Sequence, residues 1–279
     1  MTDPNQRFQL ALTSPTLVGA KDKAGWVGLF HPEGFVEDPV EAGRYRGPAN
    51  ISLFWDVFIG PQPSVKFDVK RDFFGLNTMI RQATVVSITE ADPDAVLPVP
   101  ALICYSLRDG LVGSLQAVWE PRHVIAWFIK RKAAGLKALS RHGARMIGRS
   151  GILNGLRFGM TLVGGMRHDD ARALVHAIIS GDSQQWTCLN SAKITIGCET
   201  AEEPFDGAPE PALVRLQAYA NVPLARLAIE QIVVCGHHIG AFLADPNGDG
   251  ALALMLRVKR GEVAAMTALW SSTRRVLGA

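Results

Sequence analysis

The stretch that decides the fold is Leu29-Phe-His-Pro-Glu-Gly-Phe-Val-Glu-Asp-Pro-Val40, and it is followed by Gly47-Pro-Ala49. The proline in that tripeptide stands close to the first turn of a helix, where its missing N–H costs nothing. Four large apolar residues at helical spacing come next: Ile51, Phe54, Trp55 and Phe58. They stop before Gly60-Pro61, so the sequence predicts a short amphipathic helix over residues 51–59.

Beyond this helix the hydrophobic period changes from helical to two. Val65, Phe67 and Val69 alternate with charged residues, which is typical of a strand with one solvated face. Further strands are predicted over residues 76–88, 99–107, 112–119, 232–244 and 251–258, with a hairpin turn at 108–110. Each half of the chain therefore has helices first and an antiparallel meander afterwards, which is an α+β arrangement with helices on one face of a curved sheet.

The second half of the sequence repeats the first at two offsets. Five residues recur after 160 positions: Asp22, Trp26, Leu29, Gly47 and Leu53 become Asp182, Trp186, Leu189, Gly207 and Leu213. The segment from Gly110 to Trp119 recurs after 151 positions, from Gly261 to Trp270. Two collinear sets with two tryptophan pairs favour duplication over chance. We expect a first domain over 1–128, a basic, partly helical connector over 129–165 and a second copy over 166–279.

The opening stretch resembles the ketosteroid isomerase and SnoaL-like branch of the nuclear transport factor two-like superfamily. In that branch a Leu-Phe pair, an apolar-Glu-Asp-Pro-apolar strand and a glycine that opens the next helix follow one another in this order. The match runs from about Gly25 to Ile59, and the Gly-x-Val…Trp ending extends it to Trp119. The resemblance implies two tandem cone-shaped α+β barrels, in which helices and a curved sheet enclose one apolar pocket.

The resemblance also assigns the role of general base to Asp38. A carboxylate at the mouth of an apolar cavity has its pKa raised by desolvation, and it can then take a proton from a carbon next to a carbonyl. The enolate needs hydrogen-bond donors, but the family's Tyr falls on Ser14 and its acid on Ile103 or Cys104. Tyr105, which shares a strand face with residue 103, is the best substitute donor; a Tyr packed in the sheet is the alternative.

Aromatic side chains near Asp38 offer a lining for a flat hydrophobic ligand. These candidates are Trp26, Phe30, Phe35, Phe54, Trp55, Phe58 and Trp119. Core packing is the alternative interpretation for aromatic residues at helical spacing. No cofactor and no metal are expected, because the sequence has no P-loop, dinucleotide fingerprint or catalytic Ser, His and Asp arrangement.

The second copy lacks the base, since the offset of 160 carries Asp38 onto Cys198. A neutral thiol cannot replace a carboxylate unless something lowers its pKa. We therefore expect a degenerate, mainly structural copy that packs sheet to sheet on the first as an intrachain pseudo-dimer. Further oligomerisation is left open.

The basic charge of the protein is concentrated in the connector. Residues 121–168 hold ten Lys or Arg and no Asp or Glu, whereas the other 231 residues hold 19 basic and 26 acidic side chains. A stripe of Leu136, Leu139, Met146 and Leu153 is expected to pack on the domains, with Lys137, Arg141, Arg145 and Arg149 in water. The surface is either merely solvated or binds an anionic group, such as coenzyme A phosphates or an acidic membrane surface. Nucleic acid is not expected, because interleaved aromatic residues are missing.

The composition fits a folded protein of the reducing cytoplasm. With 279 residues, 48% of them apolar and 20% charged, the chain can form two globular units. Its four cysteines show no CxxC spacing, and the N-terminus lacks the pattern of a signal peptide. A cytoplasmic location is therefore expected.

These observations support a protein that binds a hydrophobic carbonyl compound, steroid-like or polyketide-like, in its first domain. Asp38 would shuttle a proton in an isomerisation, cyclisation or dehydration. A non-catalytic small-molecule-binding or scaffold protein of the same fold is the alternative. Epoxide hydrolysis requires a second acid, and Glu37 is a poor candidate because adjacent strand residues point apart.

Overall fold

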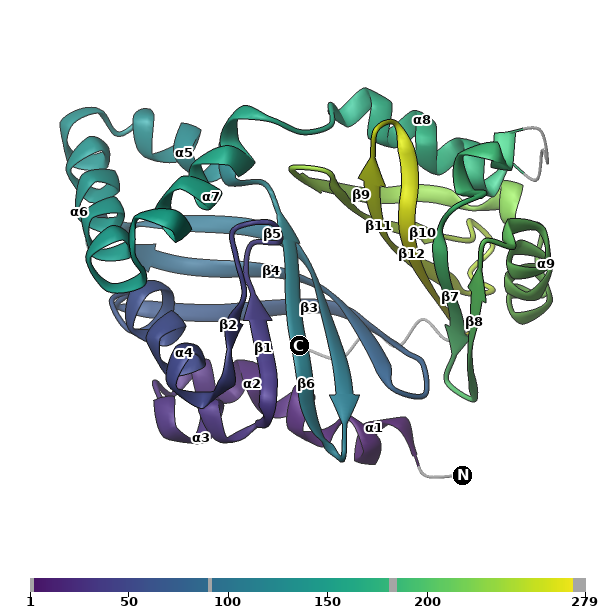
Figure 1. The fold of residues 1–279 in the computed structure, drawn as a ribbon, viewed down its shortest axis with the longest axis horizontal. Coiled ribbons are helices and arrows are strands. Elements are labelled where there is room, and N and C mark those ends of the chain that lie inside the picture. The colour runs from purple at the N-terminus through teal and green to yellow at the C-terminus, as the bar shows by residue number, and fades with distance from the viewer. Residues whose placement is uncertain (1–2, 90–91, 181–184, 273–279) are drawn as a thin grey trace.

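The computed structural model describes residues 3–89, 92–180 and 185–272, which form two tandem cone-like α+β units. Figure 1 shows the two six-stranded sheets facing each other, with most helices on their outer sides. The strand orders are β2-β1-β6-β5-β4-β3 and β8-β7-β12-β11-β10-β9, so the two units share one topology. In each sheet one pair, β1–β6 or β7–β12, is parallel. The sequence predicted purely antiparallel sheets, but both sheets are mixed. The last strand of each meander returns beside the first strand and runs parallel to it.

The first unit holds α1 (Pro4–Arg7), α2 (Gln9–Gly19), α3 (Lys23–Gly28), β1 (Phe30–Glu37), β2 (Tyr45–Arg46), α4 (Gly47–Phe54), a π-helical turn η1 (Trp55–Ile59), β3 (Ser64–Phe74), β4 (Thr78–Thr89), β5 (Asp92–Arg108) and β6 (Leu111–Trp119). Three helices follow: α5 (Pro121–Ile129), α6 (Lys132–Ser150) and α7 (Ile152–Val163). The second unit holds α8 (His168–Ile179), η2 (Gln185–Leu189), β7 (Lys193–Cys198), β8 (Ala201–Asp206), α9 (Pro209–Ala220), η3 (Leu224–Arg226), β9 (Ala228–Cys235), β10 (His238–Ala244), β11 (Ala251–Lys259) and β12 (Glu262–Ser271).

Turn residues fix several of these boundaries. Gly47 opens α4 with φ +76°, and Gly207, its counterpart 160 residues later, precedes α9 with φ +65°. Both angles lie in the left-handed region that glycine adopts without a Cβ penalty. The predicted strand over 232–244 is two strands, because Gly236 turns the chain with φ +55°. Asp182 lies outside the described residues.

The two sheets pack against each other through a shared apolar cluster. Phe73 of β3 stacks on Phe242 of β10 with ring centroids 5.8 Å apart. The backbones also approach closely, since a Cβ on Gly240 would lie 2.8 Å from the Cβ of Leu102. Polar contacts border the cluster, as where Glu202 accepts a hydrogen bond from the Thr78 hydroxyl at 2.8 Å. The interface joins the two units into one body.

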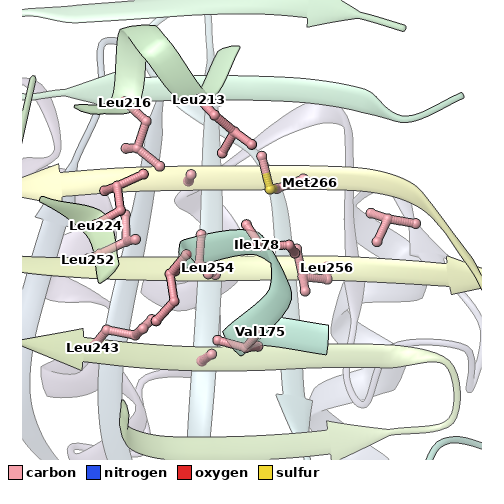
Figure 2. Close-up of a cluster of buried hydrophobic side chains, with 14 of the residues drawn as sticks. Val175, Ile178, Leu213, Leu216, Leu224, Leu243, Leu252, Leu254, Leu256 and Met266 are labelled. Carbon is pink, nitrogen blue, oxygen red and sulfur yellow. The ribbon is translucent and has the colours of Figure 1, made fainter. Parts of the chain in front are cut away.

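The core of the second unit is filled by branched aliphatic side chains. Leu243, Leu252 and Leu254 project from the sheet towards α8 and α9 (Figure 2). Val175 and Ile178 of α8 meet them from the helical side, and all five side chains are fully buried. The interior of the second unit is therefore filled by its own side chains.

Candidate functional site

The first unit encloses a cavity of about 410 Å³ between its sheet and its helices. Most of its lining is aliphatic or aromatic and comes from α2–α4, from β3–β6 and from the helices α5–α7. Alternating residues of β5, including Val99, Ala101 and Ile103, give the floor of the cavity. A volume of this size matches sites for small organic ligands, which are concave, mostly apolar and supplied with few polar groups.

Asp38 is the carboxylate in this cavity. It follows β1 directly and lies among the lining residues. Its Oδ1 accepts a hydrogen bond of 2.6 Å from Nε1 of Trp119, the last residue of β6. Burial raises the pKa of Asp38 to about 6, although the hydrogen bond from Trp119 favours the charged form and opposes this rise. The group is thus a stronger base than an exposed aspartate and is still ionised at neutral pH.

A second polar group, Ser14 of α2, lines the same cavity. Its Oγ accepts hydrogen bonds from Trp26 Nε1 at 3.0 Å and from the Tyr105 hydroxyl at 3.4 Å. Within the described residues the Ser14 oxygen therefore accepts two hydrogen bonds, and the Ser14 O–H remains as a donor. Tyr105 is fully buried behind Ser14 and is absent from the cavity lining, so its hydroxyl reaches the cavity only through Ser14.

Glu37 points away from the cavity, as the alternation along β1 predicts. Its Oε2 accepts hydrogen bonds from Arg44 at 3.0 Å and from Gln116 at 2.9 Å. Its other oxygen, Oε1, accepts the backbone N–H of Glu41 at 3.2 Å. The carboxylate of Glu37 is therefore committed to a separate network and is not an acid partner for Asp38.

The predicted aromatic residues divide into lining and core. Trp26, Phe54, Phe58 and Trp119 line the cavity. Phe30 and Trp55 are buried and pack on Trp26, with ring centroids 4.9 and 5.5 Å from it. Phe35 lies outside this cluster, under the guanidinium groups of Arg44 and Arg46. These three residues are absent from the cavity lining.

One side of the cavity is formed by helices that sequence reasoning did not assign to it. Val124, Ile125 and Phe128 of α5, Leu139, His142 and Met146 of α6 and Phe158 of α7 all line it. The His142 ring meets Phe58 edge to face at 5.3 Å, and the Phe158 ring lies 6.5 Å from that of Trp119. Residues 139, 142 and 146 share one helical face, and this spacing was the available signal. We call α5, α6 and α7 the helical cap.

The expected packing stripe of the connector is half correct. Leu139 and Met146 pack inward, but Leu136 and Leu153 are exposed. Arg141 and Arg145, which were expected in water only, border the cavity. Two glycines explain the difference: Gly135 lies against the Phe128 carbonyl and turns Leu136 outward, and Gly151 with φ +83° ends α6 before Leu153. Leu153 thus belongs to another helix.

The second unit has no carboxylate at the position of Asp38, and the strand register corrects the expected counterpart: Val36 pairs with Leu115 as Ile194 pairs with Met266, so Asp38 corresponds to the buried Ile196 and not to Cys198. Cys198 ends β7 and is only partly buried, with its Sγ 3.4 Å from the Thr200 hydroxyl in the adjoining hairpin. Within the described residues, no three His, Cys, Asp or Glu side chains are arranged to hold a metal ion. Over the same part of the chain, no helix has the length and apolar character needed to cross a membrane.

Comparisons with known proteins give structural matches only. No protein-family model and no curated protein matches the sequence. Among solved structures, the chain is similar to ketosteroid isomerase-like and SnoaL-like polyketide cyclase proteins. The Δ5-3-ketosteroid isomerase of Mycobacterium sp. is 22% identical, and the match covers 42% of this chain and 94% of that one with a TM-score of 0.38. For RV0760c of Mycobacterium tuberculosis in complex with estradiol-17β-hemisuccinate the figures are 17%, 43%, 96% and 0.39. For a SnoaL-like polyketide cyclase of Jannaschia sp. they are 16%, 43%, 89% and 0.39.

Proposed function

We propose that the first unit is an isomerase-like or cyclase-like enzyme that binds a hydrophobic carbonyl compound, with Asp38 as the proton-transfer base. The observation that carries the proposal is a carboxylate of pKa about 6 in a mostly apolar cavity of about 410 Å³. The motif resemblance around Asp38 points to steroid-like or polyketide-like rings as the substrate class. Aromatic walls from Trp26, Phe54 and Phe58 suit a flat ring system of this kind.

The chemistry follows from the position of the base. An Asp38 oxygen takes a proton from the carbon next to the substrate carbonyl, so that a C–H bond breaks and a carboxylic O–H forms. The electron pair of the C–H bond moves to the carbonyl oxygen and gives an enolate. Asp38 then returns the proton to another carbon in an isomerisation. In a dehydration it protonates the leaving hydroxyl group, and in a cyclisation the enolate carbon attacks a second carbonyl whose oxygen receives the proton.

Ser14 is the proposed donor to the enolate oxygen. Because Trp26 and Tyr105 both donate to its Oγ, the Ser14 O–H is polarised and held in one orientation. A preorganised donor in an apolar cavity stabilises developing negative charge more than water does. Tyr105 is then a positioning residue that acts through Ser14, and Trp119 positions Asp38 in the same way.

The test is turnover on a panel of cyclic β,γ-unsaturated ketones with three proteins: wild type, Asp38→Asn and Ser14→Ala. We expect Asp38→Asn to lower kcat by about 10³-fold while ligand affinity stays within a few fold, since general bases contribute roughly 10²–10⁴-fold. Ser14→Ala should lower kcat by about 10²-fold, as loss of one oxyanion donor does. Glu37→Gln, outside the cavity, is the matched control and should keep the wild-type kcat.

A non-catalytic binding protein is the second candidate, and one observation favours it. Ile103 lines the cavity at the position where the family resemblance places an acid, so a second oxyanion donor is missing there. This candidate predicts that wild type binds the ketones with the same affinity as Asp38→Asn and turns over none of them. Such a result would remove the enzymatic proposal and keep the binding site.

A further inference from the structure

The outer face of α7 is a stripe of exposed apolar side chains. Its members are Ile152, Leu153, Leu156, Met160 and Val163, which are between 60% and 87% exposed. At 100° per residue they lie within about 100° of one another around the helix axis. Ile147 of α6 extends the stripe, because its side chain contacts Gly155 at the α6–α7 junction. Contiguous exposed apolar surface of this kind marks a binding face in a water-soluble protein.

Positive charge surrounds this stripe. Residues 121–168 hold ten Lys or Arg and no acidic residue, while the rest of the chain is acidic on balance. Arg149 and Arg157 are exposed beside the stripe, Lys132 and Lys137 are exposed on α6, and Lys130 is exposed at the end of α5. The face thus combines apolar side chains with cations, which is the pattern of helices that lie in the plane of an anionic membrane surface.

The same helices form one side of the cavity. Phe158 of α7 lines the cavity and approaches Trp119, while the apolar stripe occupies the opposite side of the helix. Figure 1 shows α5, α6 and α7 together on one end of the first unit, with α6 farthest from the second sheet. One short layer of helix therefore separates Asp38 and its cavity from the apolar, basic face.

We propose that the helical cap docks on an anionic phospholipid surface, with the α7 stripe among the acyl chains and the lysines and arginines at the headgroups. Charge selects this occupant. A second copy of this chain would bring two sets of ten cations together, and a soluble phosphate ligand would leave the apolar stripe in water. If the proposed function holds, docking also places the cavity beside the membrane, where hydrophobic carbonyl compounds dissolve. The docking step itself needs no ligand and no turnover.

Flotation of the full-length protein with vesicles tests the proposal. We expect binding to vesicles of equal parts phosphatidylcholine and phosphatidylglycerol, weak binding to pure phosphatidylcholine, and release at high salt. Leu156→Gln with Met160→Gln should lower the affinity at least about tenfold, because two side chains lose their burial in lipid. Val214→Gln on α9, which removes an apolar side chain that is 61% exposed in the second unit, is the matched control and should bind as wild type does.

A second pair of variants tests the charge. Lys130→Gln, Lys132→Gln and Lys137→Gln together should lower binding to the anionic vesicles and reduce its salt dependence. Lys66→Gln, Lys193→Gln and Lys259→Gln together remove equal charge elsewhere on the exposed surface and should leave binding unchanged. Wild-type protein that stays unbound with anionic vesicles overturns the proposal. The proposal is also overturned if the double variant, Leu156→Gln with Met160→Gln, binds the vesicles as wild type does. This holds even if the double variant associates with a second copy of the chain less than wild type does.

Discussion

The two units differ in the size of the side chains along one cross-strand row of each sheet. In the first unit Ala83, Ala101 and Trp119 pair across β4, β5 and β6. In the second unit Leu243, Leu252 and Trp270 pair across β10, β11 and β12 in the same register. Ala101 lines the cavity and its neighbour Ala83 is equally small, whereas Leu243 and Leu252 fill the interior of the second unit (Figure 2). One topology therefore gives a unit with a cavity and a unit with a filled core, according to the volume of a few side chains.

The tryptophan at the end of each row shows the same contrast. Trp119 donates to Asp38 at 2.6 Å. Nε1 of Trp270 is buried and has no hydrogen-bond partner within the described residues. The second unit therefore retains the donor without its acceptor. A buried N–H without a partner lowers the stability of the folded protein. The first unit thus combines the carboxylate, its donor and a cavity, whereas the second unit keeps the tryptophan with no partner for its N–H within the described residues.

The largest expected effect comes from opening the filled row. Leu252→Ala removes a fully buried side chain and should lower the free energy of unfolding by about 2–5 kcal/mol, through lost burial and a new cavity. Chemical denaturation measures this change. Val214→Ala, at an exposed position of the same unit, should cost under about 0.5 kcal/mol. Equal effects for the two variants would show that the leucine row does not hold the second core.

Filling the open row is the reverse experiment. Ala101→Leu puts a leucine where the second unit has one, and we expect it to lower the affinity for a ring-ketone ligand by on the order of 100-fold. The melting temperature should not fall, because the added side chain occupies empty volume. Ala218→Leu on the exposed face of α9 is the control for the added bulk. Unchanged ligand affinity in Ala101→Leu would place the binding site elsewhere.

The carboxylate of Asp38 should make the stability of the first unit depend on pH. The pKa of Asp38 is about 6 in the folded protein and near 3.8 when unfolded, so its favourable contribution is present below pH 3.8 and is lost as the pH rises through 6. Asp38→Asn should therefore be more stable than wild type at pH 8, by up to about 3 kcal/mol, and equal to it below pH 3.8. Denaturation at both pH values measures this difference. For Cys198→Ser we expect the same change at both.

The two tryptophans give the smallest expected effect. Trp119→Phe removes a hydrogen bond to the charged form of Asp38, which is worth about 1.5–3 kcal/mol, and should raise the pKa of Asp38 further. The midpoint of the pH–rate profile then moves to higher pH. Trp270→Phe removes an N–H without a partner in the described residues and should leave this midpoint in place. A shift of the midpoint in both variants would break the contrast.

Much of the local structure is legible in the sequence. Gly47 and its counterpart Gly207 mark helix starts, and Asp109-Gly110 closes a hairpin with two positive φ angles, because these turns depend on the residues themselves. The position of Asp38 directly after a strand is equally local. The division of the segment around Gly236 into two strands was not predicted, because the apolar residues on both sides of Gly236-His-His238 also fit one continuous strand.

The cap could not be predicted because its packing is tertiary. The stripe of α6 faces the cavity only because Gly135 seats the helix against α5 and Gly151 ends it. The burial of Tyr105 behind Ser14 could not be predicted for a similar reason. Alternation along β5 shows which face of the sheet a side chain is on, but not whether another side chain covers it. Burial at that depth depends on α2, which is more than 80 residues away in the chain.

The most direct measurement is the pKa of the Asp38 side chain by carbon-13 nuclear magnetic resonance, with Asp38→Asn to assign its carboxyl signal. A value of about 6 is what a carboxylate in an apolar cavity requires. A value near 3.8 would show a solvated carboxylate, and it would contradict both the cavity site and the proton-transfer role proposed for it.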